Sequence, residues 1–186
     1  MTPELADDLR QIEAIKAEAR ALVAGLPHDR FNQRSAPGRW SVAECLDHLN
    51  SIRSVFPAID RTIEDAERRS LRNPGPFQYG WWARSNVRWM EPPPKFRMKT
   101  WKLLMPRDTP LGVNDVLPDF LDLRDQLAER AKRADGLDLK RAIVQSPVSR
   151  WFRLPLGAYF AFLLAHDRRH LWQARRVLTE PPGGSS

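Results

Sequence analysis

Two of the four histidines, His166 and His170, lie four residues apart within residues 156–178, where apolar residues recur with the period of an α-helix. Side chains at positions i and i+4 of a helix lie one above the other on the same face. A helical wheel places both imidazoles on the apolar face and Arg168, Arg169 and Trp172 on the opposite one. Because an unpaired buried polar group costs about 1–3 kcal/mol, two buried imidazoles need partners. A shared metal ion would satisfy both, and hydrogen bonds within the core are the alternative.

A third ligand would have to come from elsewhere, and His48 is the strongest candidate. It lies on a helix that begins at Ser41, since Ser41 and Glu44 have the S-x-x-E spacing of a capping box. On that helix His48 lies beside the apolar stripe, from where it can reach a neighbouring helix or extend to solvent. The remaining histidine, His28, follows Pro27 between two predicted helices, and we expect it in an exposed loop.

Two segments of the chain are similar to motifs of the DinB superfamily, a family of helical bundles of the DinB/YfiT type. Residues 40–49 (WSVAECLDHL) resemble its W-S-x-x-E-x-x-x-H-L helix start, and residues 166–173 (HDRRHLWQ) resemble its H-x-x-R-H-x-x-Q helix. Residues 94–97, 145–147 and 156–157 are also similar to the family pattern, so the resemblance covers roughly residues 5–178. It implies that His48, His166 and His170 are three metal ligands, and all three are present here.

The resemblance implies a divalent metal ion, such as Zn, Ni or Fe, and a small-molecule substrate. The activity would be that of a metal-dependent hydrolase or of a transferase that uses a low-molecular-weight thiol. Three histidines without a carboxylate ligand leave metal positions open for water, a thiol or substrate, which is typical of catalytic sites. The catalytic residues themselves stay unassigned, and Gln173, one turn beyond His170, is the best candidate to orient a ligand. A metal- or ligand-binding stress protein without turnover is the alternative.

Composition is typical of one domain over residues 1–186, with residues 181–186 as a loose tail: 42% of residues are hydrophobic and 28% are charged. The longest nearly apolar run is shorter than the roughly 20 residues that span a bilayer, so we expect no membrane partner. Cys45 is the single cysteine, which suits a cytoplasmic protein, and its place on an apolar stripe predicts an inert core thiol. The net charge is +7, but the basic residues are spread along the chain, which makes a nucleic-acid-binding protein the weaker interpretation.

Helical periodicity predicts four long helices, over residues 3–24, 41–70, 114–133 and 156–178. The second is expected to bend at Pro57, and Pro118 is tolerable only near the first turn of the third. Four amphipathic helices with one long connection predict an all-α four-helix bundle, and bundle cores commonly hold metal sites.

A Pro- and Trp-rich crossover over residues 71–112 joins the second and third predicted helices. Its aromatic residues are Tyr79, Trp81, Trp82, Trp89, Phe96 and Trp101. We expect most of them to anchor the crossover to the bundle, with one or two at the mouth of the site; a substrate lid is the alternative. The aromatic surface also predicts a homodimer formed through residues 81–101 or a flanking helix.

Overall fold

The computed structural model describes residues 1–93, 104–108, 110–147, 149 and 151–180. Helices dominate, so the all-α class is confirmed. The helices of the bundle are α1 (Pro3–Val23), α3 (Val42–Asn50), α4 (Phe56–Arg68), α6 (Val113–Arg133) and α7 (Leu156–Thr179). The other elements are α2 (His28–Asn32), the 3-10 helix η1 (Ser51–Val55), α5 (Trp81–Met90) and the strands β1 (Ile143–Gln145) and β2 (Arg153–Pro155).

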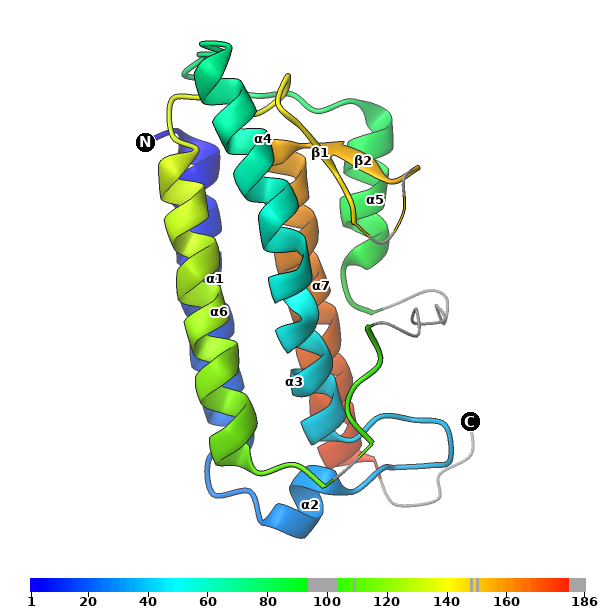
Figure 1. Ribbon diagram of the computed structural model, residues 1–186. Helices are drawn as coiled ribbons and strands as arrows, with labels where there is room; N and C mark the ends of the chain where they lie inside the picture. Colours follow the sequence, from blue (N-terminus) through cyan, green and yellow to red (C-terminus); the bar gives the residue numbers. More distant parts are fainter. Residues whose placement is uncertain (94–103, 109, 148, 150, 181–186) are drawn as a thin grey trace.

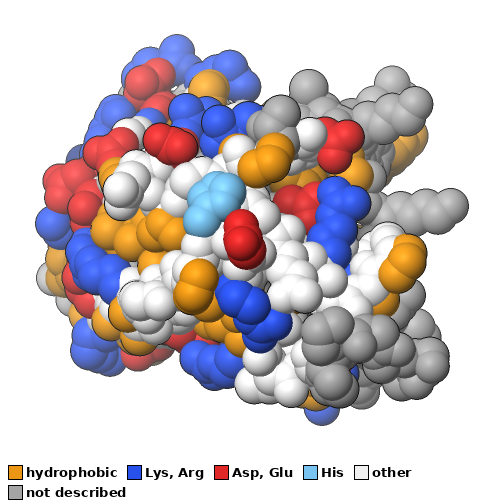
Figure 2. Space-filling view, turned by 90° about the horizontal axis from the view of Figure 1, so that it is seen from below, with side chains coloured by type: hydrophobic (Ala, Val, Ile, Leu, Met, Phe, Trp, Pro, Cys, Tyr) orange, Lys and Arg blue, Asp and Glu red, His pale blue; other side chains and the backbone are white. Residues whose placement is uncertain are grey.

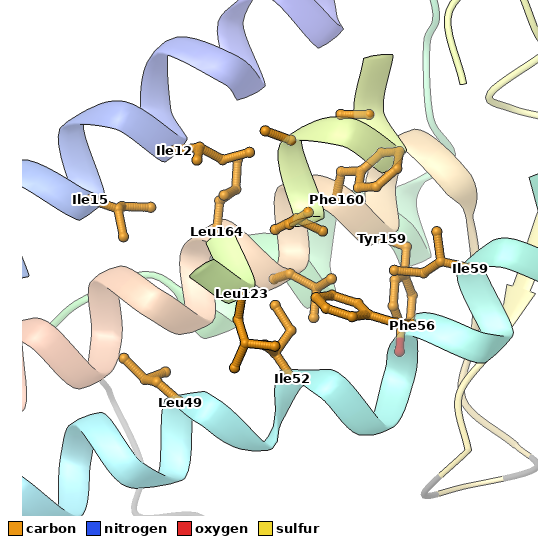
Figure 3. Close-up of a cluster of buried hydrophobic side chains, with 14 of the residues drawn as sticks. Ile12, Ile15, Leu49, Ile52, Phe56, Ile59, Leu123, Tyr159, Phe160 and Leu164 are labelled. Atoms are coloured by element: carbon orange, nitrogen blue, oxygen red, sulfur yellow. The ribbon is translucent and has the colours of Figure 1, made fainter. Parts of the chain in front are cut away.

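Four rods form the bundle, namely α1, the consecutive elements α3, η1 and α4, α6, and α7 (Figure 1). Both α6 and α7 pack against α1 and α3, so the rods alternate around one core in the order α1, α6, α3, α7. Each buried aliphatic or aromatic side chain in this core contributes about 1.5–3 kcal/mol relative to an exposed one. Side chains from all four rods meet there (Figure 3), among them Ile12, Ile15, Leu49, Ile52, Phe56, Ile59, Leu123, Tyr159, Phe160 and Leu164.

The second predicted helix, residues 41–70, is not continuous. The chain tightens into the 3-10 helix η1 after Asn50 and resumes as α4 at Phe56. The break therefore comes before Pro57 rather than at it. A proline ring clashes with the carbonyl four residues earlier and has no N–H to offer it, whereas the first turn of a new helix tolerates proline. By contrast, Pro118 lies in the second turn of α6, further inside the helix than the sequence suggested.

The crossover contains a helix, α5, which the sequence analysis did not predict. α5 packs against α7 and buries Ala83 and Met90 on its inner face. The expected anchoring is correct for Tyr79, which packs against the core, but wrong for the tryptophans of α5: Trp81 is 73% exposed, Trp82 55% and Trp89 70%. Phe96 and Trp101 lie outside the described residues.

Tyr79 anchors the crossover at the first turn of α7. A Cβ atom added to Gly157 would lie 1.9 Å from the Tyr79 hydroxyl oxygen and 3.3 Å from the Leu139 Cβ. Only glycine allows so close an approach, which gives a physical reason for the Leu-Gly pair at residues 156–157 that the family pattern shares.

A short hairpin, also not predicted, leads into α7. β1 and β2 pair antiparallel with Val144 opposite Leu154, both buried. The backbone N–H of Leu156 then donates to the Ala142 carbonyl, which holds the start of α7 against the hairpin. In the part of the chain that the structure describes, none of the helices is apolar over enough of its length to cross a bilayer.

Candidate metal centre

Three imidazole rings meet between α3 and α7. His48 projects from α3, and His166 and His170 project from consecutive turns of α7. The Nε2 atoms of His48 and His166 are 3.2 Å apart, and His170 lies with its ring centroid 4.6 Å from each of the other two. One nitrogen from each ring lies within 4.8 Å of the others. His48, whose orientation the sequence left open, therefore faces the bundle seam and not solvent.

The local sequence determines the position of each histidine along its helix. The Ser41 side chain accepts the backbone N–H of Glu44, and the Glu44 carboxylate accepts the backbone N–H of Ser41, so the predicted capping box is present. This box sets the first turn of α3, and His48 follows two turns later. On α7 the spacing of four residues stacks His166 and His170, as the helical wheel predicted.

A third element completes the environment of the rings. The His48 Nδ1 atom lies 2.7 Å from the carbonyl oxygen of Leu104, a residue of the crossover. Because a carbonyl oxygen only accepts, Nδ1 carries the proton and Nε2 of His48 presents its lone pair to His166. The indole of Trp40 stacks on His170 at 5.5 Å between centroids and tilts against His48 at 4.8 Å, forming one wall of the site.

Burial favours the neutral form of all three imidazoles. It lowers the pKa of His48, and it lowers the pKa values of His166 and His170 well below the usual 6.5, with mutual repulsion as the next cause. His48 and His170 are only 4% and 8% exposed, whereas His166 keeps part of its surface open. Neutral imidazole is the form that binds metal ions.

The arrangement fits a metal ion. Metal–nitrogen bonds of about 2.0–2.1 Å in a tetrahedral site place the ligand nitrogens roughly 3–3.5 Å apart, and the His48–His166 spacing agrees. Among the described residues, the buried Nδ1 atom of His170 has no hydrogen-bond partner, so a metal ion would satisfy it. Among the described residues, no carboxylate or thiol joins the group, so a metal held by the three rings would have open positions.

The sequence pattern that defines the DinB superfamily matches residues 11–174. The chain belongs to the DinB superfamily. No curated protein and no solved structure matches it.

Among the other residues of this DinB protein that the sequence offered for the site, one lies beside the three rings and the rest lie apart from them. Gln173 is half-buried on α7, where it contacts His170 and favours its protonated form. Glu44 pairs with Arg34 outside the cluster. The Cys45 thiol is fully buried, and burial raises its pKa, as expected of an inert core cysteine. His28 has an exposed side chain, as predicted, but it begins the short helix α2 and does not lie in a loop.

Sequence reasoning missed several residues around the DinB site. Arg169, assigned by the helical wheel to the solvent face, is buried, and it donates to the Trp89 carbonyl of α5. Asp47 receives the backbone N–H and the guanidinium of Arg107, which ties residues 104–107 to α3 beside the histidines. Trp40 was recognised only as part of the family pattern. These contacts join segments far apart in sequence, and no spacing within the chain signals them.

A buried ion pair lies directly behind the histidines of this DinB fold. Arg124 of α6 and Asp167 of α7 are 0% and 1% exposed, and the guanidinium binds both carboxylate oxygens. Burial raises the pKa of the Asp167 carboxyl, and the Arg124 charge opposes that rise. The sequence carries one signal for this pair, since Arg124 lies among the apolar residues of the stripe on α6.

Proposed function

We propose that this DinB protein binds one divalent metal ion through His48, His166 and His170 and uses it in catalysis on a small-molecule substrate. The observation that carries the proposal is the meeting of three neutral imidazoles without a carboxylate among the described residues. The reaction would be a metal-dependent hydrolysis or a transfer to a low-molecular-weight thiol, in the cytoplasm. A divalent ion held here would polarise a substrate and lower the pKa of water or of a thiol.

The residues of the chain have distinct roles in this proposal. Leu104 fixes the protonated nitrogen of His48, so that Nε2 is the ligand atom. Trp40 excludes water from one side and offers an aromatic face to the substrate. His166, the most exposed of the three rings, marks the side from which substrate and metal enter.

A non-catalytic metal- or ligand-binding protein is the second candidate, because three histidines can hold a metal ion without any turnover. The surface does not favour a nucleic-acid function: at the end of the bundle that carries α2, basic and acidic side chains are interspersed (Figure 2).

Metal analysis of protein purified without a histidine tag tests the first part of the proposal. We expect close to one equivalent of a transition metal per chain. The metal-loaded protein is then incubated with glutathione and an aromatic electrophile, and separately with ester and amide substrates. Turnover that His166→Ala abolishes supports an enzyme. Stoichiometric metal without any turnover across thiols and substrates supports the non-catalytic alternative.

We also propose a two-fold homodimer. Its support is the exposed surface of Trp81, Trp82 and Trp89 on α5, since large exposed apolar patches often mark interfaces. Sedimentation equilibrium over a wide concentration range, repeated at high salt, tests it. A monomer at every concentration removes the dimer but leaves the metal site, because all three histidines come from one chain.

A further inference from the structure

Arg124 is the largest side chain in the described part of the protein that is fully buried, and it lies on α6, a bundle helix that brings no histidine to the site. Its guanidinium packs over the Phe120 ring, 3.8 Å from the ring centroid. A fully buried charge needs both a counter-ion and hydrogen-bond acceptors for its remaining N–H groups. The residues that bind the Arg124 guanidinium therefore indicate the role of this side chain.

Those partners are the residues that directly follow two of the proposed ligands. The Nε and Nη2 atoms donate to the two carboxylate oxygens of Asp167, which follows His166 on α7. The Nη1 and Nη2 atoms also donate, at 3.2 Å each, to the carbonyl oxygen of Leu49, which follows His48 on α3. That carbonyl lies where α3 gives way to the 3-10 helix η1, at the end of the regular helix.

We propose that Arg124 is a positioning residue for the metal centre: its guanidinium sets the distance between His48 and His166 by holding the next residue on each of their helices. The inference rests on the proposed function, and it assigns to α6 control over metal affinity although α6 supplies no ligand. The planar fork of arginine suits this role, because it binds a carboxylate and a carbonyl in fixed directions at once.

The argument is geometric. A metal–nitrogen bond tolerates a departure of only about 0.2 Å, so the separation of two ligands on different helices must be held closely. Apolar packing between α3 and α7 is compatible with small sliding of one helix along the other. Directional hydrogen bonds from one rigid group to both helices resist such sliding. Their acceptors belong to the residues that follow His48 and His166.

The experiment replaces the buried pair with apolar side chains, as Arg124→Met/Asp167→Leu. Removing one partner would leave an uncompensated buried charge, whereas replacing both is often neutral for stability. The matched control is Arg130→Met/Asp60→Leu. Arg130 also lies on α6, packs over a phenylalanine ring and pairs with an aspartate of a neighbouring helix, but away from the histidines.

Three quantities are measured for wild type, variant and control: the Zn²⁺ dissociation constant by chelator competition, the visible spectrum with Co²⁺, and thermal unfolding of the metal-free protein. We expect Arg124→Met/Asp167→Leu to bind Zn²⁺ roughly 10–100-fold more weakly, as changes beside metal ligands do, with an altered Co²⁺ spectrum. The control should keep the wild-type affinity and spectrum.

A folded variant that binds Zn²⁺ as tightly as the control, with the wild-type Co²⁺ spectrum, overturns the positioning role and makes the pair merely structural. If the double variant does not fold, Arg124→Lys decides in its place, because lysine keeps the charge but cannot form the fork. Unchanged affinity in that folded variant is equally decisive. Wild-type protein that takes up no metal overturns the proposed function together with this inference, so the two failures are distinct.

Discussion

Each of the three imidazoles takes its orientation from a different neighbour. His48 donates to the Leu104 carbonyl, His170 lies against the Trp40 indole, and His166 faces His48 across the seam. The three neighbours come from the crossover, from the residue before the capping box and from α3. Contacts within the chain therefore orient each ring, which reduces the side-chain rearrangement that binding an ion would require.

His166→Ala should abolish stoichiometric metal uptake and leave most of the helix content intact. The ring lies at the seam and the bundle is held by its apolar core, so its loss removes a ligand without exposing a large apolar surface. Metal analysis and circular dichroism check the two halves of this prediction. His28→Ala is the matched control, since His28 is exposed and lies away from the cluster. Full metal content in His166→Ala would refute the ligand assignment.

The stability of the metal-free protein should fall on acidification. Burial, the main cause, holds the pKa values of His166 and His170 well below 6.5, so the unfolded chain binds more protons than the folded one. The contribution of these groups is complete above pH 6.5 and is lost as the pH falls through the folded pKa values. In urea unfolding between about pH 7 and about pH 5, the free energy of unfolding should fall more steeply for wild type than for His170→Gln.

Asp8 contributes to stability with the opposite pH dependence. Comparing wild type with His170→Gln at each pH cancels this contribution, because both proteins contain Asp8. Burial, helped by repulsion from Asp7, raises the pKa of Asp8 to about 7. Its contribution is therefore present below pH 3.8 and is lost as the pH rises through about 7. Parallel pH profiles for wild type and His170→Gln would contradict the histidine prediction.

At the level of elements, Gly157→Ala should destabilise the fold. The added methyl group would collide with the Tyr79 hydroxyl, and overpacking of this kind costs about 1–3 kcal/mol. Alanine is the better helix former by about 0.8–1 kcal/mol in a helix interior, but less in the first turn, so the clash dominates. Chemical denaturation measures the difference.

Tyr79→Phe serves as the companion of that variant. The buried Tyr79 hydroxyl has no hydrogen-bond partner among the residues that the structure describes, so its removal alone should cost little. In the Gly157→Ala background it should recover part of the lost stability. A Gly157→Ala protein as stable as wild type would show that the crossover is not anchored through this contact.

The long helices could be predicted and the short ones could not. α1, α6 and α7 begin and end within one residue of the ranges expected from periodicity, because a long amphipathic segment has few ways to bury its stripe. α2, α5 and the hairpin are too short to show a period, and their tertiary contacts decide them. The residues of the site also differ in how far the sequence predicts them. The family motifs identified the three histidines. The contacts of Leu104, Arg169 and Arg124 could not be predicted, because they join segments that only the fold brings together.

For the whole molecule, metal should raise the stability of the native state by mass action. An ion that binds only the folded protein adds about 2.7 kcal/mol when its free concentration is about 100 times its dissociation constant. For a chain of this length that corresponds to a rise in Tm of roughly 5–10 °C. Differential scanning calorimetry with and without Zn²⁺ measures it. His166→Ala should show no shift, and an equal shift in that variant would mean that the ion binds elsewhere.

The position of α7 in the chain has a consequence for synthesis. α7 is the last helix of the bundle to leave the ribosome, yet it packs against α1, α3 and α5 and brings two of the three histidines. Until it emerges, the earlier helices have no partner for much of their apolar surface, and His48 has no imidazole to meet. Folding of the bundle and metallation must therefore wait until α7 has emerged, and for that interval the nascent chain depends on protection from aggregation.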